Sequence, residues 1–206
     1  MLTFLMIWGC GGATDPIEFP DGLEPLPVDN TAEWPANNTE AINTNGGEDG
    51  DLIWVHARAY IHNTLDAIYP CLQEPEINLD RQEDPQWSIT RDVEEGYEHS
   101  YRLDITVENI LTVEYEDTWR HGSVYDEDDV RNRTVTAWQM TQGNSFMTIK
   151  RGSLVADVVE AEITSLDIIY EMDVALPDEE QMIRYLEDVH AELIACSDGD
   201  PLPPTD

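Results

Sequence analysis

The chain has 206 residues, 41% of them hydrophobic, and its ten basic and 44 acidic residues give a formal net charge of −34. This length and composition suffice for one domain with a sizeable core. The negative charge would repel phosphate backbones and anionic lipid headgroups, which excludes nucleic-acid binding and electrostatic adsorption to membranes. We interpret the acidic residues as a solvated surface, with a binder of cationic ligands as the alternative.

The chain opens with MLTFLMIWGCGG, an apolar run that ends at Cys10. It is too short to span a bilayer, which needs about 20 apolar residues. The letters IWGC before two glycines resemble a bacterial lipobox, in which signal cleavage leaves an acylated cysteine. Trp8 is unusual for that motif, and no Lys or Arg precedes the cysteine as a signal peptide requires. Either the true start lies upstream, which we favour, or the match is fortuitous.

Residues 11–50 are rich in proline, glycine, asparagine and acid, and no basic residue precedes Arg58. Such a segment buries too little apolar area to offset the entropy cost of ordering it. The sequence therefore predicts a flexible acidic linker at 11–50 after a truncated signal peptide at 1–10. Phe19 and Trp34 are expected to be loose aromatic residues, with docking on the domain as the alternative.

Regular structure is predicted from residue 51 onward. The stretch DLIWVHARAYIHN alternates apolar and polar residues, which is typical of a strand with one buried face. A short helix follows, with Asn63 or Thr64 as its N-cap and with Leu65, Ile68 and Leu72 on its apolar side; Pro70 would limit or kink it.

Further alternating runs begin near residues 100, 111, 132, 145 and 162. Such alternation predicts an antiparallel sheet with one solvated face. The last element differs, because Met182, Leu186, Val189 and Leu193 have helical spacing and Gly199 is a stop signal. This long amphipathic helix must cover the apolar face of the sheet, and residues 198–206 are predicted to form a frayed tail.

The order of these elements resembles the START/Bet v 1-like superfamily (SRPBCC, helix-grip). WVHARAYIHNTLDAIYPCLQEPE is similar to the opening strand and helix of that family, and IKRGSLVADVVEAEITSLDIIYEMDVA to its penultimate hairpin. The resemblance covers Asp51 to Ser197 and implies an α+β fold in which a curved antiparallel sheet wraps around a long C-terminal helix. A lipocalin-like barrel or a β-sandwich is the alternative, which the late long helix disfavours.

Members of this superfamily often enclose a cavity for lipids, sterols, polyketides or other hydrophobic ligands. The resemblance implies that six inward positions would lie near its wall. These positions are Tyr101, Leu103, Tyr115, Trp119, Tyr170 and Met172. The alternative for each of them is that it fills a solid core.

The same resemblance places Cys71, on the short helix, beneath Cys196 at the end of the long one, so that a disulfide between them is expected in an exported protein. Two buried free thiols are the alternative. No C-x-x-C pair is present, the histidines are scattered, and DEDD at 126–129 is interpreted as a solvated hairpin tip. The sequence thus predicts no metal site, cofactor or catalytic set.

Together these features predict a non-enzymatic, lipid-anchored domain on the bacterial cell envelope that faces the periplasm or the exterior. Its partners would be the membrane, through acylated Cys10, and a hydrophobic small molecule in a cavity between sheet and helix. A structural or protein-interaction module with a filled core is the first alternative. A cyclase-like enzyme is the second.

Overall fold

The computed structural model of the chain describes residues 22–28, 31–76, 85–108, 112–175 and 178–203. The described strands are β1 (Ile42–Asp49), β2 (Leu52–Ile61), β3 (Pro85–Arg91), β4 (His99–Glu108), β5 (Thr112–Tyr125), β6 (Arg131–Gly143), β7 (Met147–Glu160) and β8 (Ile163–Val174). The α-helices are α1 (Leu65–Leu72) and α3 (Glu179–Asp198), and a short 3-10 turn, Ala36–Asn38, precedes β1.

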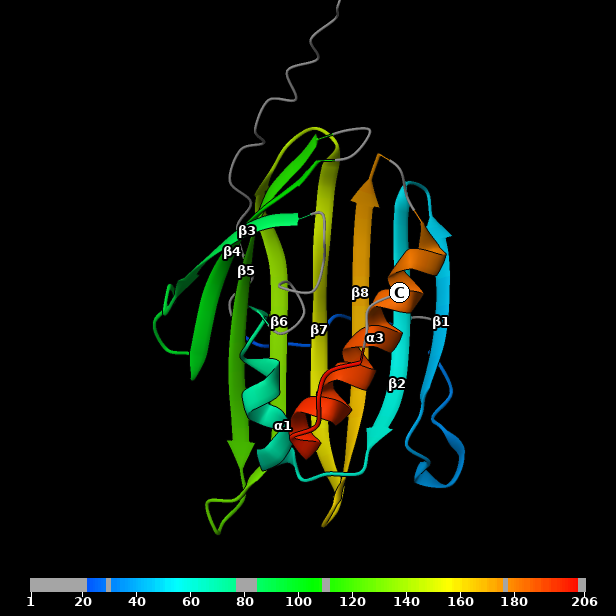
Figure 1. Cartoon of the computed structure of the whole chain (residues 1–206), viewed down its shortest axis with the longest axis vertical. Coiled ribbons are helices and arrows are strands. Elements are labelled where there is room, and N and C mark those ends of the chain that lie inside the picture. The colour runs from blue at the N-terminus through cyan, green and yellow to red at the C-terminus, as the bar shows by residue number, and fades with distance from the viewer. Residues whose placement is uncertain (1–21, 29–30, 77–84, 109–111, 176–177, 204–206) are drawn as a thin grey trace, which may run out of the picture.

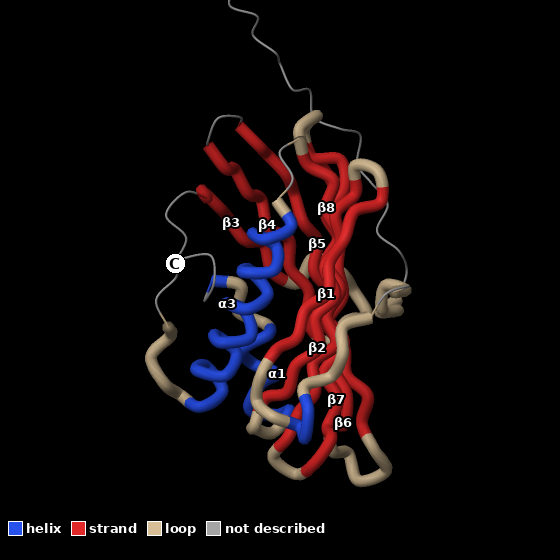
Figure 2. The backbone as a smooth tube through the Cα atoms, turned by 90° about the vertical axis from the view of Figure 1, so that its right-hand side faces the viewer, coloured by secondary structure: helices blue, strands red, loops and turns tan. Residues whose placement is uncertain are grey.

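The eight strands form one antiparallel sheet in the order β1-β2-β8-β7-β6-β5-β4-β3. Figure 1 shows α3 lying across β7, β8 and β2, with α1 beside its C-terminal end. Figure 2 shows that both helices lie on the same side of the sheet. We call this side the inner face. The architecture confirms the predicted α+β fold, a curved antiparallel sheet that holds a long C-terminal helix.

The predicted alternation matches the burial of the inward residues of β2 and β8, whereas residues 134–138 of β6 are all buried, so that both faces of the sheet are covered there. In β2 the predicted inward residues, from Ile53 to Ile61, are all at most 2% exposed. In β8, Leu166 and Ile168 are buried while Asp167 between them is partly exposed. Side chains of α3 complete this core from above, since Met182, Leu186 and Leu193 are buried against it. Each such apolar side chain contributes roughly 1.5–3 kcal/mol on burial.

Strand β1 corrects the expectation that the linker extends to residue 50. Residues 42–49, read from the sequence as linker, pair along their whole length with β2, from Ile42 with Ala59 to Asp49 with Leu52. The sequence INTNGGED has low strand propensity, but β2 would otherwise offer an unpaired edge. Glycine also permits a close approach here, because a Cβ at Gly47 would lie 2.8 Å from the Trp54 ring. Tertiary pairing thus overrides local preference.

A second part of the expected linker lies along the outer face of the sheet, where residues 22–28 and 31–35 form what we call the outer strap. Figure 1 shows it in dark blue behind the strands. The Leu26 amide donates to Ser153 Oγ (3.0 Å), and the Ala32 amide donates to His56 Nδ1 (2.7 Å). Trp34 packs on Tyr60 with ring centroids 5.2 Å apart, so it is docked rather than loose. Phe19 lies outside the described residues.

Side chains cap both helices at their starts. Thr64, one of the two predicted caps, accepts a hydrogen bond from the Ala67 amide, and α1 ends two residues after Pro70. Asp178 accepts from the Gln181 amide (3.1 Å) at the start of α3. Gly199, with φ of 73°, ends α3 in the left-handed conformation that favours glycine.

Candidate ligand-binding cavity

A cavity of about 460 Å³ lies between the inner face of the sheet and α3. Most of its lining is apolar or aromatic, contributed by β4 to β8, α1 and α3. The six residues expected near such a cavity all line it: Tyr101, Leu103, Tyr115, Trp119, Tyr170 and Met172. The space between sheet and helix is therefore not completely filled by side chains, and its volume suits a small organic molecule.

Four exposed residues belong to the cavity lining: Glu74 after α1, and Ala175, Asp178 and Gln181 around the start of α3. The cavity therefore reaches solvent near these two places. Glu74 and Asp178 are acidic, so its approaches disfavour an anionic ligand.

An aromatic row crosses the inner face along one line of paired residues. Tyr101 pairs with Trp119, Trp119 with Trp138, Trp138 with Gly152, and Gly152 with Tyr170. The rings of Trp119 and Trp138 stack with centroids 4.7 Å apart, and Tyr101 stacks on Trp119 at 5.6 Å. These four aromatic residues line the cavity and offer broad, flat surfaces to a ligand.

Gly152 allows this row to continue across β7. A Cβ at this position would lie 2.0 Å from Trp138 Cζ2 and 2.5 Å from the Ile169 carbonyl oxygen. We therefore expect Gly152→Ala to displace the Trp138 ring and to lower the free energy of unfolding by about 1–3 kcal/mol, the usual cost of overpacking. Urea denaturation would measure the loss, which should shrink when Trp138→Leu is introduced as well. A Gly152→Ala protein with unchanged stability and near-UV circular dichroism would contradict this role.

Lys150 is the only lysine in the chain, and it lies in the cavity wall on β7, 9% exposed. Its ammonium group donates a hydrogen bond to Asp117 on β5, a residue with no exposed surface. The Lys150 nitrogen also lies 4.7 Å from the centre of the Tyr115 ring. The mostly apolar cavity wall thus carries one basic group, paired with the Asp117 carboxylate, and buried Glu192 on α3 also lines the cavity.

Burial and their mutual contact shift the pKa values of both Lys150 and Asp117. Burial alone would lower the pKa of Lys150, but the Asp117 carboxylate holds it well above the usual lysine range. Burial raises the pKa of the Asp117 carboxyl, and Lys150 offsets only part of that effect. Burial also raises the pKa of Tyr185 to about 12, so this cavity-lining hydroxyl stays protonated at neutral pH. Asp117 Oδ1 has no hydrogen-bond partner among the described residues.

Sequence reasoning missed Lys150 and Asp117, although a signal for both was present. Lys150 shares the alternating set of Leu154 on β7, and Asp117 shares that of Tyr115 on β5. Both sets face the cavity. A charged residue in the inward set of each of two strands is the pattern that would have identified the pair.

His121 is a second buried titratable group, close to the Tyr101 end of the aromatic row. It is completely buried, and Nδ1 lies 2.9 Å from the Thr136 hydroxyl. Nε2 has no partner among the described residues, and the His99 ring lies 5.5 Å away. Burial, aided by His99, lowers the pKa of His121 to about 3.

This shift predicts that the protein loses stability in mild acid. The unfolded chain binds a proton at His121 below pH about 6.5, whereas the folded chain resists it down to about 3. The stability that depends on neutral His121 is fully present above pH 6.5. Below pH 6.5 the free energy of unfolding falls by up to about 1.4 kcal/mol per pH unit. Urea midpoints between pH 7 and 4 would measure the slope, which His121→Gln should flatten. The exposed His62→Gln should leave it unchanged; equal slopes for both variants would refute the assignment.

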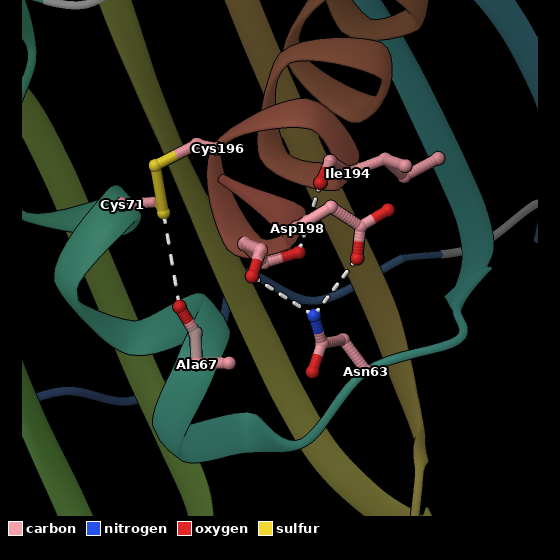
Figure 3. The surroundings of a disulfide bond; sticks show 7 residues. Asn63, Ala67, Cys71, Ile194, Cys196 and Asp198 are labelled. Carbon is pink, nitrogen blue, oxygen red and sulfur yellow. Dashed lines mark hydrogen bonds between the residues drawn. A yellow bond between two sulfur atoms is a disulfide. The ribbon is translucent and has the colours of Figure 1, made fainter. Parts of the chain in front are cut away.

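Cys71 and Cys196 form a disulfide that joins the end of α1 to the end of α3, with the Cα atoms 6.1 Å apart (Figure 3). Both residues also line the cavity. Beside the disulfide, Asn63 Nδ2 donates to the Ser197 carbonyl oxygen (3.0 Å) and to Asp198 Oδ1 (3.1 Å). These contacts attach the segment before α1 to the last turn of α3, so the two helices form one cover over the cavity.

The proposed lipidation site, Cys10, lies outside the described residues. Neither described helix is long and apolar enough to cross a bilayer. Among the described residues, no three His, Cys, Asp or Glu side chains are grouped closely enough to hold a metal ion.

Comparison with solved structures identifies the fold. The lipid transfer and protein localization domain of human StarD13 superposes with a TM-score of 0.51 at 10% identity, covering 84% of this chain and 90% of that one. Human StAR-related lipid transfer protein 5 superposes with a TM-score of 0.53 at 9% identity, covering 83% and 89%. Neither protein-family models nor curated protein sequences give a match to the chain. With its curved antiparallel sheet closed by a C-terminal helix, the chain has the START/Bet v 1-like, helix-grip fold.

Proposed function

We propose that the protein binds a hydrophobic small molecule in the cavity beneath α3. The main support is the cavity itself, whose volume of about 460 Å³ and aromatic walls suit a ligand of drug-like size. Two proteins with this fold, the human StarD13 domain and human StAR-related lipid transfer protein 5, are named for lipid transfer, which agrees with an apolar ligand. A module with a filled core would leave no such space.

Lys150 gives the proposed ligand an orientation. Its charged group lies on an otherwise mostly apolar wall, close to Tyr115. A ligand with an apolar body and one polar group would place that group beside Lys150 and its body along the aromatic row. A purely hydrocarbon ligand would leave the ammonium group without a polar contact to the ligand.

Binding can be tested with N-phenyl-1-naphthylamine, a neutral probe that fluoresces in apolar surroundings. We expect saturable binding of one probe per chain. Val189, on α3, lines the cavity, and Val189→Trp would place a larger ring within it. Val159→Trp is the matched control, since Val159 lies at the end of β7 and is 43% exposed. Probe affinity should fall at least about tenfold in the first variant and stay unchanged in the second; equal affinities would refute binding in the cavity.

We also propose that acylation of Cys10 anchors the domain to the outer side of a bacterial membrane. The IWGCGG motif supports this, and so does the Cys71–Cys196 disulfide, because disulfides persist in oxidising compartments outside the cytoplasm. The wild-type protein should fractionate with membranes and show an acylated Cys10 by mass spectrometry. Cys10→Ser should release it into the soluble fraction. Soluble, unmodified wild-type protein would refute the anchor.

A further inference from the structure

We propose that Lys150 attaches a ligand covalently, as an imine formed with an aldehyde or ketone carbonyl carbon. This inference rests on the proposed function, because it requires a ligand in the cavity. Lys150 is the only lysine in the chain, and its side chain lines the cavity beside the aromatic row.

The choice of lysine is itself informative. The other nine basic residues of the chain are all arginines. Arginine would give a buried carboxylate a bidentate and permanently charged partner, so a purely structural ion pair with Asp117 favours arginine. Lysine differs in that its nitrogen can lose a proton and act as a nucleophile toward carbonyl carbons. The one lysine of this chain lines the cavity in which we propose that a ligand binds.

Asp117 is suited to two roles in this chemistry. It is fully buried and hydrogen-bonded to the Lys150 ammonium group. It favours the ammonium form by raising the pKa of Lys150, and it is also the base in direct contact that would take up the proton when the amine reacts. Its second oxygen, Oδ1, has no hydrogen-bond partner in the described part of the chain. After the imine has formed, the same carboxylate would be the counterion of the protonated imine in a site of low dielectric constant.

The step balances without any further reactant. Asp117 accepts one proton from the ammonium group, and the neutral amine adds to the carbonyl carbon to give a carbinolamine. The carbinolamine oxygen leaves as water after taking up the proton that Asp117 returns. Of the three ammonium protons, one stays on the iminium nitrogen and two leave with the oxygen. The net charge of the pair is unchanged, so no uncompensated charge is buried.

The surroundings indicate which carbonyl compounds would fit. Trp119 and Trp138 stack in one row with Tyr101, which favours a flat, conjugated body. Glu74 and Asp178 at the openings disfavour a carboxylate on the ligand. We therefore assign the site to neutral, flat aldehydes or ketones whose carbonyl group lies at one end.

The test uses 2-naphthaldehyde and sodium cyanoborohydride, which reduces imines to stable amines. The full chain with Arg184→Lys has an internal reference, because Arg184 is on α3 with a side chain 57% exposed. Peptide mapping by mass spectrometry then compares labelling at Lys150 with labelling at the introduced lysine in one sample. We expect labelling at Lys150 to be at least about tenfold faster, because the bound aldehyde is held next to the nitrogen. Excess 2-naphthalenemethanol, which lacks the carbonyl, should slow labelling at Lys150 but leave labelling at the introduced lysine unchanged.

Labelling at Lys150 no faster than at the introduced lysine would overturn the inference. Binding of N-phenyl-1-naphthylamine, measured on the same protein, then decides whether the proposed function fails too: retained binding refutes only covalent attachment, and lost binding refutes both. Lys150→Arg should bind the neutral probe and show no label at position 150. Asp117→Asn should move the pH profile of labelling at Lys150 to lower pH without affecting the introduced lysine, because burial then lowers the pKa of Lys150 with no carboxylate to oppose it.

Discussion

Lys150→Met is expected to lower the free energy of unfolding by about 3–5 kcal/mol at pH 7, because it leaves the Asp117 carboxyl buried without its ammonium partner. Urea denaturation followed by tryptophan fluorescence would measure the loss. The cost should be smaller at pH 5, since protonation of Asp117 removes the unpaired charge. Burial raises the pKa of this carboxyl above its unfolded value even in the wild-type protein, so the variant should lose stability as the pH rises.

A double variant separates the loss of the pair from loss of packing. Lys150→Met together with Asp117→Leu should recover most of the stability, because replacement of both partners by apolar side chains removes the uncompensated charge. Lys150→Arg keeps the positive charge, so its free energy of unfolding should fall less than that of Lys150→Met. A loss below about 1 kcal/mol for the single Lys150→Met substitution at pH 7 would show that Asp117 does not depend on Lys150.

Opening the Cys71–Cys196 disulfide is expected to cost about 4–5 kcal/mol. The two cysteines are 125 residues apart, so the bond removes much of the chain entropy of the unfolded state. The free energy of unfolding measured with and without dithiothreitol should show this difference, and the double variant Cys71→Ser, Cys196→Ser should match the reduced protein. Affinity for the cavity probe should fall as well, since the disulfide joins the two helices that cover the cavity.

Cys10 provides the control for this experiment. In Cys10→Ser the Cys71–Cys196 bond is intact, so dithiothreitol should destabilise that variant as much as the wild-type protein. A shift equivalent to less than about 1 kcal/mol on reduction of either protein would contradict a stabilising role for the disulfide.

The sequence predicted those elements whose burial pattern follows their own periodicity. Strands β2, β4 to β8 and helix α3 each present an apolar set at a spacing of two or of 3.6 residues, and each is found. The ends of the helices likewise depend on local residues, such as Thr64 at the start of α1 and Gly199 at the end of α3. Local capping and periodicity are properties that a single sequence contains.

Strand β1 and the outer strap could not be predicted in the same way. Their residues are polar, rich in glycine and proline, and have no sustained period. What orders them is a surface made by other elements: the free edge of β2, and an outer face on which His56 accepts a hydrogen bond from Ala32. Such partners are distant in sequence, so propensity and composition indicate a linker where the fold provides a docking surface.

Strand β3 is an intermediate case. No strand was expected between the short helix and residue 100, yet Trp87 and Ile89 alternate and pack against the buried Tyr101, Leu103 and Ile105. The segment is seven residues long, which leaves too few repeats for the alternation to stand out.

Native mass spectrometry of the protein purified gently from its own cells tests cavity binding most directly. We expect one small hydrophobic molecule per chain, absent from Val189→Trp but present in Val159→Trp, since Val189 lines the cavity and Val159 does not. A bare protein mass that stays unchanged on titration with N-phenyl-1-naphthylamine, or equal ligand content in both variants, would contradict the proposed function.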